Sequence, residues 1–335
     1  MLLSSSGPDA ASRAALRLLM QRLPGVSVVE GASSIEPVVH SDAPILRSAQ
    51  LVEGTTLRAI KIPNLSRETP SGFGAFLDGA QSVRVVAHHA SGAPIVFGTV
   101  SAAVRVRVDR RMATWDKQPP RVERKIYIPL RYLPEMAEPA GAASANGGWQ
   151  LVDTSTADRD GEYPSKHPAA LLERAIRAVD QDRDRLEDKL AEAWCERAES
   201  PLFIDGGINR SERVAKSSSA VGVIKSHRTL YVEGDALPVV LGLEKGERSS
   251  IFRVSPRSRN AVLSWYLRLR EREGHDPMWG LVRVEMAECE QAPQRADEVS
   301  RWVMAETTPL SLPDGRWDKM AYGVRDCEEF LRAIS

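Results

Sequence analysis

Phe73-Gly-Ala-Phe-Leu-Asp-Gly79 and Ser200-Pro-Leu-Phe-Ile-Asp-Gly-Gly207 are two short apolar stretches that both run into Asp-Gly. An apolar run of this length is typical of a buried strand, and Asp-Gly is typical of its exposed carboxyl end. Two such strands would bring Asp78 and Asp205 together, where paired carboxylates suit a hard cation. Either Asp-Gly alone is more often a turn former. The two Asp-Gly segments therefore indicate a cation site only when they are taken together.

Composition limits the protein class only loosely. The chain has 335 residues, 42% of them hydrophobic, which is enough for one large domain or two smaller ones. Lys plus Arg and Asp plus Glu both number 45, so the net charge neither indicates nor excludes a nucleic-acid binder. The three cysteines show no CxxC spacing, which argues against a zinc ribbon and for a reducing compartment. With neither a signal-peptide pattern nor a membrane-length apolar run, the sequence predicts a cytoplasmic protein that does not enter membranes.

The order of expected elements predicts an α/β fold with a mixed sheet flanked by helices. Apolar periodicity predicts a long helix from Pro168 to Arg197 and shorter helices at about 9–23, 295–305 and 324–334. Strands are expected at 73–78, 83–88, 94–98, 104–108, 125–129, 202–205, 221–225, 249–254, 263–269 and 280–285. Residues 1–70 are expected to form a helical or irregular N-terminal extension, and 71–335 the main domain, with a surface loop at 137–163.

Further carboxylates follow the two aspartates in an order that favours one acidic centre. Glu187 lies on the long helix 18 positions before Asp205, and Asp326 lies at the start of the last helix. Carboxylates that converge in this way would bind one or two Mg²⁺ or Mn²⁺ ions. The ordinary alternatives are a solvated ion pair for Glu187 and a helix cap for Asp326. Glu285, at a strand end, is either a further acid of the centre or part of a salt bridge.

Lys225 ends a predicted strand, Val221-Gly-Val-Ile-Lys225. Near carboxylates, its ammonium group would hold a phosphate or orient a water molecule. The alternative is an ordinary surface lysine whose stem lies along apolar surface.

Four short segments together resemble the NurA nucleases. They are Ala75-Phe-Leu-Asp-Gly-Ala80, Leu202-Phe-Ile-Asp-Gly-Gly207, Val221-Gly-Val-Ile-Lys225 and Arg283-Val-Glu285, which stand in the order expected for that family. The resemblance implies an RNase H-like fold and a DNA nuclease that uses Mn²⁺ or Mg²⁺. It also implies that Asp78, Glu187 and Asp205 are metal ligands and that Lys225 is the strand-end lysine of the family. Asp184 and Asp188 remain alternatives to Glu187.

The chain departs from the family at its C-terminal end. NurA proteins have a histidine ligand at the start of the last helix, whereas this chain reads Trp317-Asp-Lys-Met-Ala-Tyr-Gly-Val-Arg-Asp326. Asp326 is expected to take the place of that histidine. The resemblance further implies a homodimer that works with HerA, a hexameric ATPase, in DNA end processing or antiviral defence. The chain itself has no GxxxxGK[ST] motif, so ATP-driven movement would come from such a partner.

A cluster of arginines and aromatic residues is the candidate DNA-binding surface. Arginine contacts phosphates and aromatic rings stack on bases, a combination that suits single strands. The alternative is that the aromatic residues belong to the core and the arginines are solvated. The cluster comprises Arg253, Arg257, Arg259, Trp265, Tyr266, Arg268 and Arg270.

Three functional hypotheses follow from these patterns. The first is a metal-dependent DNA nuclease of the NurA type. The second is a catalytically weak or inactive adaptor subunit on the ATPase ring, which the missing histidine favours. The third is another RNase H-like enzyme, such as an Argonaute-type nuclease guided by nucleic acid.

Overall fold

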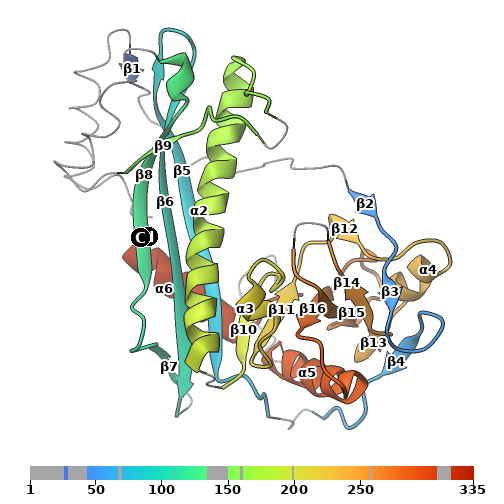
Figure 1. Ribbon diagram of the computed structural model, residues 1–335. Helices are drawn as coiled ribbons and strands as arrows, with labels where there is room; N and C mark the ends of the chain where they lie inside the picture. The colour runs from blue at the N-terminus through green and yellow to red at the C-terminus, as the bar shows by residue number, and fades with distance from the viewer. Residues whose placement is uncertain are drawn as a thin grey trace.

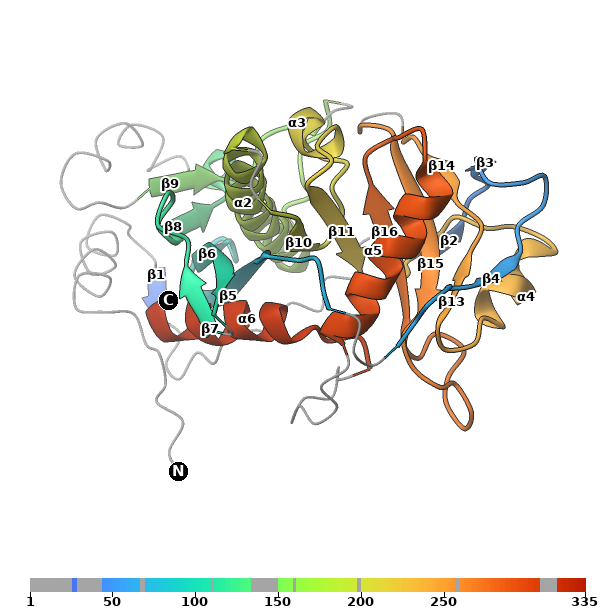
Figure 2. The same ribbon diagram turned by 90° about the horizontal axis from the view of Figure 1, so that it is seen from below.

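The computed structural model describes residues 26–28, 44–66, 70–109, 111–133, 150–158, 161–197, 200–256, 259–307 and 318–335. The helix predicted over residues 9–23 lies outside these ranges. Within them, fourteen strands form one mixed sheet that helices cover on both faces (Figures 1 and 2). The mixed α/β sheet flanked by helices that the sequence predicts is therefore confirmed.

Five strands in the middle of the sheet have the order and directions of an RNase H-like fold. The order across the sheet is β8-β6-β5-β10-β11. Neighbours β8, β6 and β5 are antiparallel, whereas β5, β10 and β11 are parallel to one another. The strands are β5 (Ala75–His89), β6 (Pro94–Val108), β8 (Arg121–Ile128), β10 (Leu202–Asp205) and β11 (Ala220–Ile224).

The first Asp-Gly does not end its strand. β5 runs without interruption through Asp78 and Gly79 and forms a 15-residue strand, where the sequence predicted two separate ones. A Cβ atom on Gly79 would lie 2.2 Å from Glu187 Oε1, so the close approach of side chains from a helix, and not a turn, favours a glycine here. The second Asp-Gly is as predicted, because β10 ends at Asp205 and the chain leaves the sheet at Gly206, whose φ is 142°.

Alternation along β5 and β10 places two cores on the two faces of the sheet. Leu77 and Ile204 belong to the core under α2 (Pro168–Arg197), and α3 (Glu212–Ala215) lies on this same side (Figure 2). Phe76 and Phe203 belong to the core under α5 (Ala292–Glu306) and α6 (Tyr322–Ile334). Side chains alternate in a strand, so each residue of β5 or β10 is assigned to one helix layer by its position alone.

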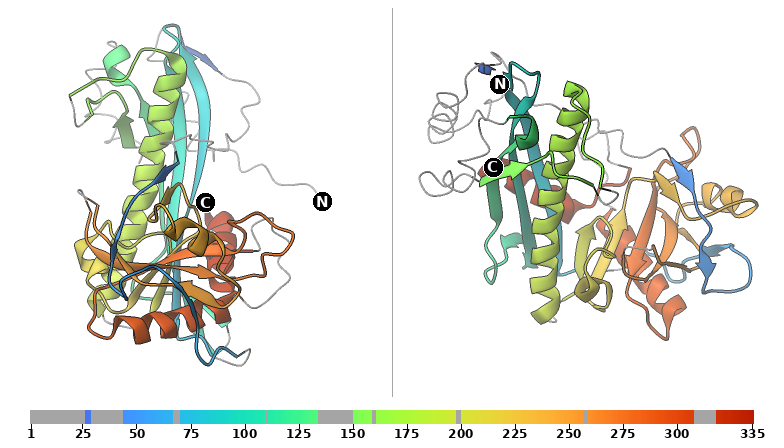
Figure 3. Two further views of the ribbon diagram at one scale, coloured as in Figure 1. Left: turned by 90° about the vertical axis from the view of Figure 1, so that its right-hand side faces the viewer. Right: turned by 45° about the horizontal axis from the view of Figure 1, so that its top comes forward.

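The C-terminal half extends the same sheet (Figure 3). β16 (Leu281–Met286) pairs antiparallel with β11, and β15 (Val262–Arg268) pairs with β16. Segment 44–62, which was assigned to an N-terminal extension, contributes strands to this half: β3 pairs with β14 and β4 pairs with β13. The paired strands are β3 (Gln50–Leu51), β4 (Ala59–Lys61), β13 (Glu247–Ser249) and β14 (Phe252–Val254), while β2 (Ile45–Leu46) and β12 (Thr229–Leu230) form a separate two-stranded sheet.

The remaining elements lie at the periphery. They are β1 (Val26–Val28), β7 (Arg111–Thr114), η1 (Leu130–Tyr132), β9 (Gln150–Asp153) and α4 (Ala236–Leu241). β9 falls inside the predicted surface loop and pairs with β8 at the edge of the sheet. None of the helices in the described ranges is long and apolar enough to span a bilayer.

Candidate active site

Asp78 and Asp205 lie side by side on neighbouring parallel strands. Leu77 is registered with Ile204, and each aspartate is the next residue of its strand. Each aspartate lies two residues after a phenylalanine, Phe76 or Phe203, and so shares its face, which places both carboxylates on the α6 face of the sheet. The pairing predicted from two Asp-Gly sequences is thus present, although only one aspartate ends a strand.

Asp78 is a buried carboxylate with little compensation. Its exposed fraction is 7%, and in the described chain its carboxylate accepts a hydrogen bond only from the Gly79 backbone N–H, at 2.8 Å. Burial, followed by the charge of Asp205, raises the pKa of Asp78 well above its ordinary value, and Lys225 opposes this. A buried carboxylate without a bonded cation is unfavourable for folding, which marks the position as a candidate functional site.

Lys225 holds the second aspartate. Its Nζ lies 2.8 Å from Asp205 Oδ2 and 4.0 Å from Met320 Sδ. Both side chains are about one-fifth exposed, at 18% for Lys225 and 20% for Asp205. This contact argues against the alternative of an unpaired surface lysine and places an ammonium group beside the aspartate pair.

Glu187 approaches the pair from the opposite face. It projects from α2 onto Gly79, where the missing side chain leaves room for its carboxylate. Burial raises the pKa of Glu187 to about 7, although Arg183 at 3.3 Å and Arg210 at 3.1 Å act against that rise. Its charge in turn raises the pKa of Asp78. Glu187 is thus a buried acid next to the pair and not the solvated helix ion pair that was the alternative.

Arg210 joins the loop after β10 to three acids of α2. Its guanidinium group lies 3.1 Å from Asp184, 3.1 Å from Glu187 and 3.0 Å from Asp188. Asp184 and Asp188 are therefore held by this arginine. Of the three, Glu187 is the acid that covers Gly79 and acts on Asp78.

Asp326, the predicted acid of α6, is bound elsewhere, and Glu328 of the same helix carries a charge that affects Asp78. Asp326 is ion-paired with Arg105 at 2.6 Å, and the charge of Glu328 raises the pKa of Asp78. Glu328 is 9% exposed. The sequence carried a signal for it, because Glu328 shares the helical spacing of the apolar residues Val324, Cys327 and Leu331, all of which are fully buried.

Glu285 belongs to a different group. It accepts a hydrogen bond from the Ile208 N–H at 2.9 Å and is paired with Arg283 at 2.6 Å. Its carboxylate would lie 3.0 Å from a Cβ atom on Gly207, so it supports the loop that follows β10. The salt-bridge alternative is the one the structure shows.

The oxygen donors present suit a divalent cation, but they are divided between two faces. Among the described residues, no three or more His, Cys, Asp or Glu side chains are arranged to hold a metal ion. Asp78 and Asp205 supply two carboxylates on the α6 face, while Glu187 lies beyond Gly79 in contact with two arginines. The chemistry of the aspartate pair fits Mg²⁺ or Mn²⁺.

The predicted DNA-binding surface is largely interior. Trp265, Tyr266 and Arg268 are all fully buried. Trp265 donates a hydrogen bond to Ser300 Oγ at 2.9 Å, and the Tyr266 hydroxyl accepts one from the Tyr231 N–H at 2.8 Å. They cannot stack on bases, because the fully paired strand β15 places them between the helix layers.

The arginines of that surface have mostly structural contacts. Arg268 donates to the backbone carbonyls of Leu241 and Leu243 at 2.9 and 3.1 Å, and burial lowers its pKa to about 10. Arg270 is buried as well and donates to the Thr307 carbonyl. Arg253 is an exposed partner of Glu288, and Arg259 donates to Asn209 Oδ1 at 3.1 Å. Arg257 lies outside the described residues.

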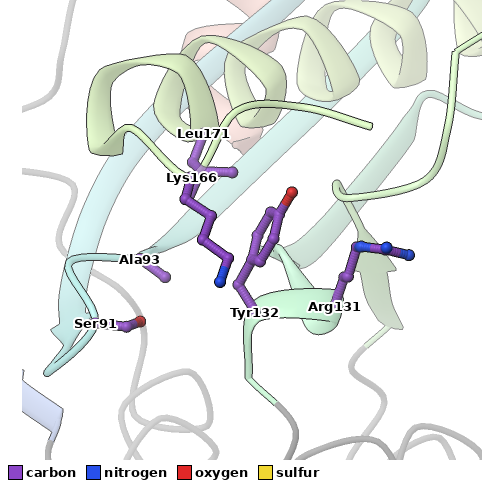
Figure 4. A pocket seen from close by; sticks show the side chains of 6 residues that line it. All are labelled: Ser91, Ala93, Arg131, Tyr132, Lys166 and Leu171. Atoms are coloured by element: carbon purple, nitrogen blue, oxygen red, sulfur yellow. The ribbon is translucent and has the colours of Figure 1, made fainter. Parts of the chain in front are cut away.

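Three pockets that border α2 or the residues just before it do not include the aspartates. One, of about 360 Å³, is formed by the β5–β6 turn, η1 and the start of α2, with Lys166, Tyr132 and Arg131 around it (Figure 4). The other two border the first half of α2. None of them includes Asp78, Asp205 or Glu187, so the candidate site is not one of these hollows.

Comparison with known proteins finds similarity at the level of structure. No protein-family model matches the chain, and no curated protein is similar to it in sequence. The crystal structure of the NurA nuclease from Sulfolobus solfataricus has a TM-score of 0.43 and 8% sequence identity, over 85% of this chain and 81% of the other. A similarity of this size assigns no role to any residue here, so the roles rest on the geometry described above.

Proposed function

We propose that this protein is a metal-dependent nuclease that cleaves DNA at the Asp78–Asp205 pair. The observation that supports this is the pair itself: two carboxylates, adjacent on parallel strands of an RNase H-like sheet, one of them buried without a bonded cation. Proteins rarely keep such a carboxylate for stability, because burial without compensation is costly. A divalent cation would supply the missing positive charge.

Asp78 and Asp205 would hold Mn²⁺ or Mg²⁺, and Glu187 and Glu328 would add negative charge nearby. Such an ion, when bound, polarises the phosphodiester and lowers the pKa of a coordinated water molecule. Lys225 would orient the Asp205 carboxylate through its 2.8 Å contact. Arg210 would hold Glu187 and the loop after β10 in place through its three ion pairs.

The partners in this proposal are DNA, a second copy of the chain and a HerA-like hexameric ATPase. The order of the motifs in the sequence supports that proposal, and the absence of a GxxxxGK[ST] motif is consistent with an external source of ATP-driven movement. The setting would be DNA end processing or antiviral defence. Co-purification of the chain with such an ATPase, as a complex of fixed composition, tests this part separately from cleavage.

Conservative variants of the two aspartates test the nuclease. Asp78→Asn and Asp205→Asn should each lower Mn²⁺-dependent cleavage of linear DNA at least about 100-fold, beyond the roughly 10–100-fold typical of residues that only orient ligands. Asp116→Asn is the control, because that side chain is 75% exposed and is paired with Lys117 at 3.2 Å. Cleavage by both aspartate variants at the native rate, with native thermal unfolding, would exclude the site.

An adaptor subunit is the second candidate. It is favoured by the division of the acids between two faces and by the two arginines bound to Glu187. In that case the purified chain, alone and with the ATPase, would leave linear DNA intact while still forming the complex. Robust metal-dependent cleavage would eliminate this candidate.

A further inference from the structure

A groove between α2 and the edge of the sheet has the features of a second binding site. It has a volume of about 480 Å³ and lies between β9 with the residues that follow it and the first half of α2. β9 and this part of the helix are neighbours in both Figures 1 and 2. A hollow of this size is within the range of small-molecule and nucleotide sites.

One wall of the groove is a row of cations on a single helical face. Arg174, Arg177 and Arg185 line it together with Gln181, at the spacing that stacks residues along one side of a helix. The row spans 11 residues of helix, or about 16 Å. In the described part of the chain, Arg174 and Arg177 form no ion pair with a carboxylate, whereas Arg185 is paired with Asp182. A row of this length suits a chain of anions better than a single ion.

The opposite wall holds a buried hydroxyl without a partner. Thr154 is 5% exposed, lines the groove, and its Oγ1 has no hydrogen-bond partner among the described residues. An unpaired buried hydroxyl is unfavourable and is usually satisfied by water or a ligand. A threonine hydroxyl can donate to an oxyanion, as can the guanidinium groups across the groove.

Two acids also line the groove, and both have other partners. Asp153 Oδ1 accepts hydrogen bonds from the Leu130 N–H at 3.1 Å and the Ser155 N–H at 2.8 Å. Asp158 Oδ1 accepts one from the Glu162 N–H at 2.9 Å. They are thus held by the loops at the rim and are not paired with Arg174 or Arg177.

We infer that this groove binds the phosphodiester backbone of a nucleic-acid strand. Arginine forks and hydroxyl donors together match phosphate oxygens, and cations spread along about 16 Å match successive phosphates. The choice of nucleic acid over another polyanion rests on the proposed nuclease function. Glu187 faces the other side of α2, so the groove would hold substrate at a distance from the aspartate pair and not at the point of cleavage.

The test is DNA binding without cleavage. Fluorescence anisotropy with a labelled single-stranded oligonucleotide, in a buffer that contains a metal chelator, measures Kd over a range of salt concentrations. Arg177→Ala should weaken binding about fivefold to tenfold and lower the salt slope by about 0.7, the value for one phosphate contact on a single strand. Thr154→Val keeps the shape of the side chain and should weaken binding about threefold to tenfold.

Lys189→Ala is the matched control. Lys189 is an exposed cation on the same helix and does not line the groove. Its removal should leave Kd within about twofold and leave the salt slope unchanged. If Arg177→Ala and Thr154→Val bind like the native chain, or if all three variants weaken binding equally, the groove is not the site.

Competitors separate the possible occupants. An unlabelled oligonucleotide should displace the probe at concentrations where inorganic phosphate and poly-glutamate do not. Displacement by poly-glutamate at an equal concentration of charge would overturn the assignment in favour of an acidic protein partner. Because the chelator prevents cleavage, a failure here leaves the aspartate site untouched, and loss of the nuclease proposal leaves the binding result interpretable.

Discussion

The structure contains two kinds of buried carboxylate, and Asp78 and Glu285 represent them. Glu285 is fully buried and is paired with Arg283 at 2.6 Å and with the Ile208 N–H at 2.9 Å. Asp182 is similar, with Lys125 at 2.9 Å and the Tyr127 hydroxyl at 2.7 Å. Asp78 is buried to nearly the same extent, with the Gly79 N–H at 2.8 Å and no cation in direct contact among the described residues.

The presence or absence of a paired cation separates carboxylates that stabilise the fold, such as Glu285, from Asp78, whose burial destabilises it. A compensated pair costs little once formed, but the loss of one partner leaves a buried charge. A buried carboxylate without a paired cation destabilises the folded state, so its replacement by a neutral side chain should raise the free energy of unfolding. Stability measurements on matched Glu→Gln and Asp→Asn variants therefore test the assignment without any assay of activity.

The largest effect is expected for Glu285→Gln. The substitution removes the carboxylate that is paired with the Arg283 guanidinium group and should lower the free energy of unfolding by about 3–5 kcal/mol. Asp78→Asn should instead raise the free energy of unfolding in metal-free buffer at neutral pH, because the raised pKa shows that burial opposes ionisation of Asp78. Urea unfolding followed by circular dichroism measures both.

Opposite signs for these two variants would support the distinction. If Asp78→Asn lost as much stability as Glu285→Gln, Asp78 would be a structural acid and the comparison would fail. The gain from Asp78→Asn should also vanish at low pH, where the native carboxyl group is protonated in both the folded and the unfolded state.

A smaller effect, linked to pH, is expected for Glu187. Its pKa is raised to about 7 in the folded chain from an ordinary value of 4.5. The folded state therefore binds this proton more tightly than the unfolded state, and stability is lost as pH rises from 4.5 through 7. The loss approaches about 3 kcal/mol above pH 7 and is absent below 4.5.

Glu187→Gln removes this pH dependence. The difference in unfolding free energy between Glu187→Gln and the native chain, followed from pH 4 to 8 in metal-free buffer, should shift in favour of the variant as pH rises. Loss of the Arg183 and Arg210 contacts adds a nearly constant offset, so the slope and not the absolute value is diagnostic. A flat difference would show that Glu187 ionises like an exposed acid.

The sequence predicted secondary structure well where periodicity was strong. The helix over Pro168–Arg197 has the predicted bounds, because one apolar stripe repeats along its whole length. Asp205, Lys225 and Glu187 lie where their strands and helix were expected. Asp78-Gly79 was misread as a strand end, because the space that Glu187 requires is visible only in three dimensions.

The cluster of arginines and aromatic residues shows that residue types alone do not distinguish a binding surface from a core. Trp265 and Tyr266 fit a surface or a core equally well by sequence, and the contacts of Arg268 with the Leu241, Leu243 and Pro277 carbonyls cannot be predicted from a sequence. Asp326 and Glu328 show the opposite case. The apolar spacing of α6 places Glu328 on the buried side of the helix, whereas the family resemblance implied Asp326, two places away.

The smallest expected effect concerns this C-terminal acid. Glu328 acts on Asp78 at a distance, so Glu328→Gln should raise the Mn²⁺ concentration for half-maximal cleavage about threefold to tenfold, equivalent to roughly 1 kcal/mol. Asp326→Asn should leave that concentration within about twofold, because the Asp326 carboxylate is 30% exposed and bound to Arg105. The reverse order would restore Asp326 as the acid of the site. Equal effects of both variants would mean that α6 acts on the site only through its overall charge.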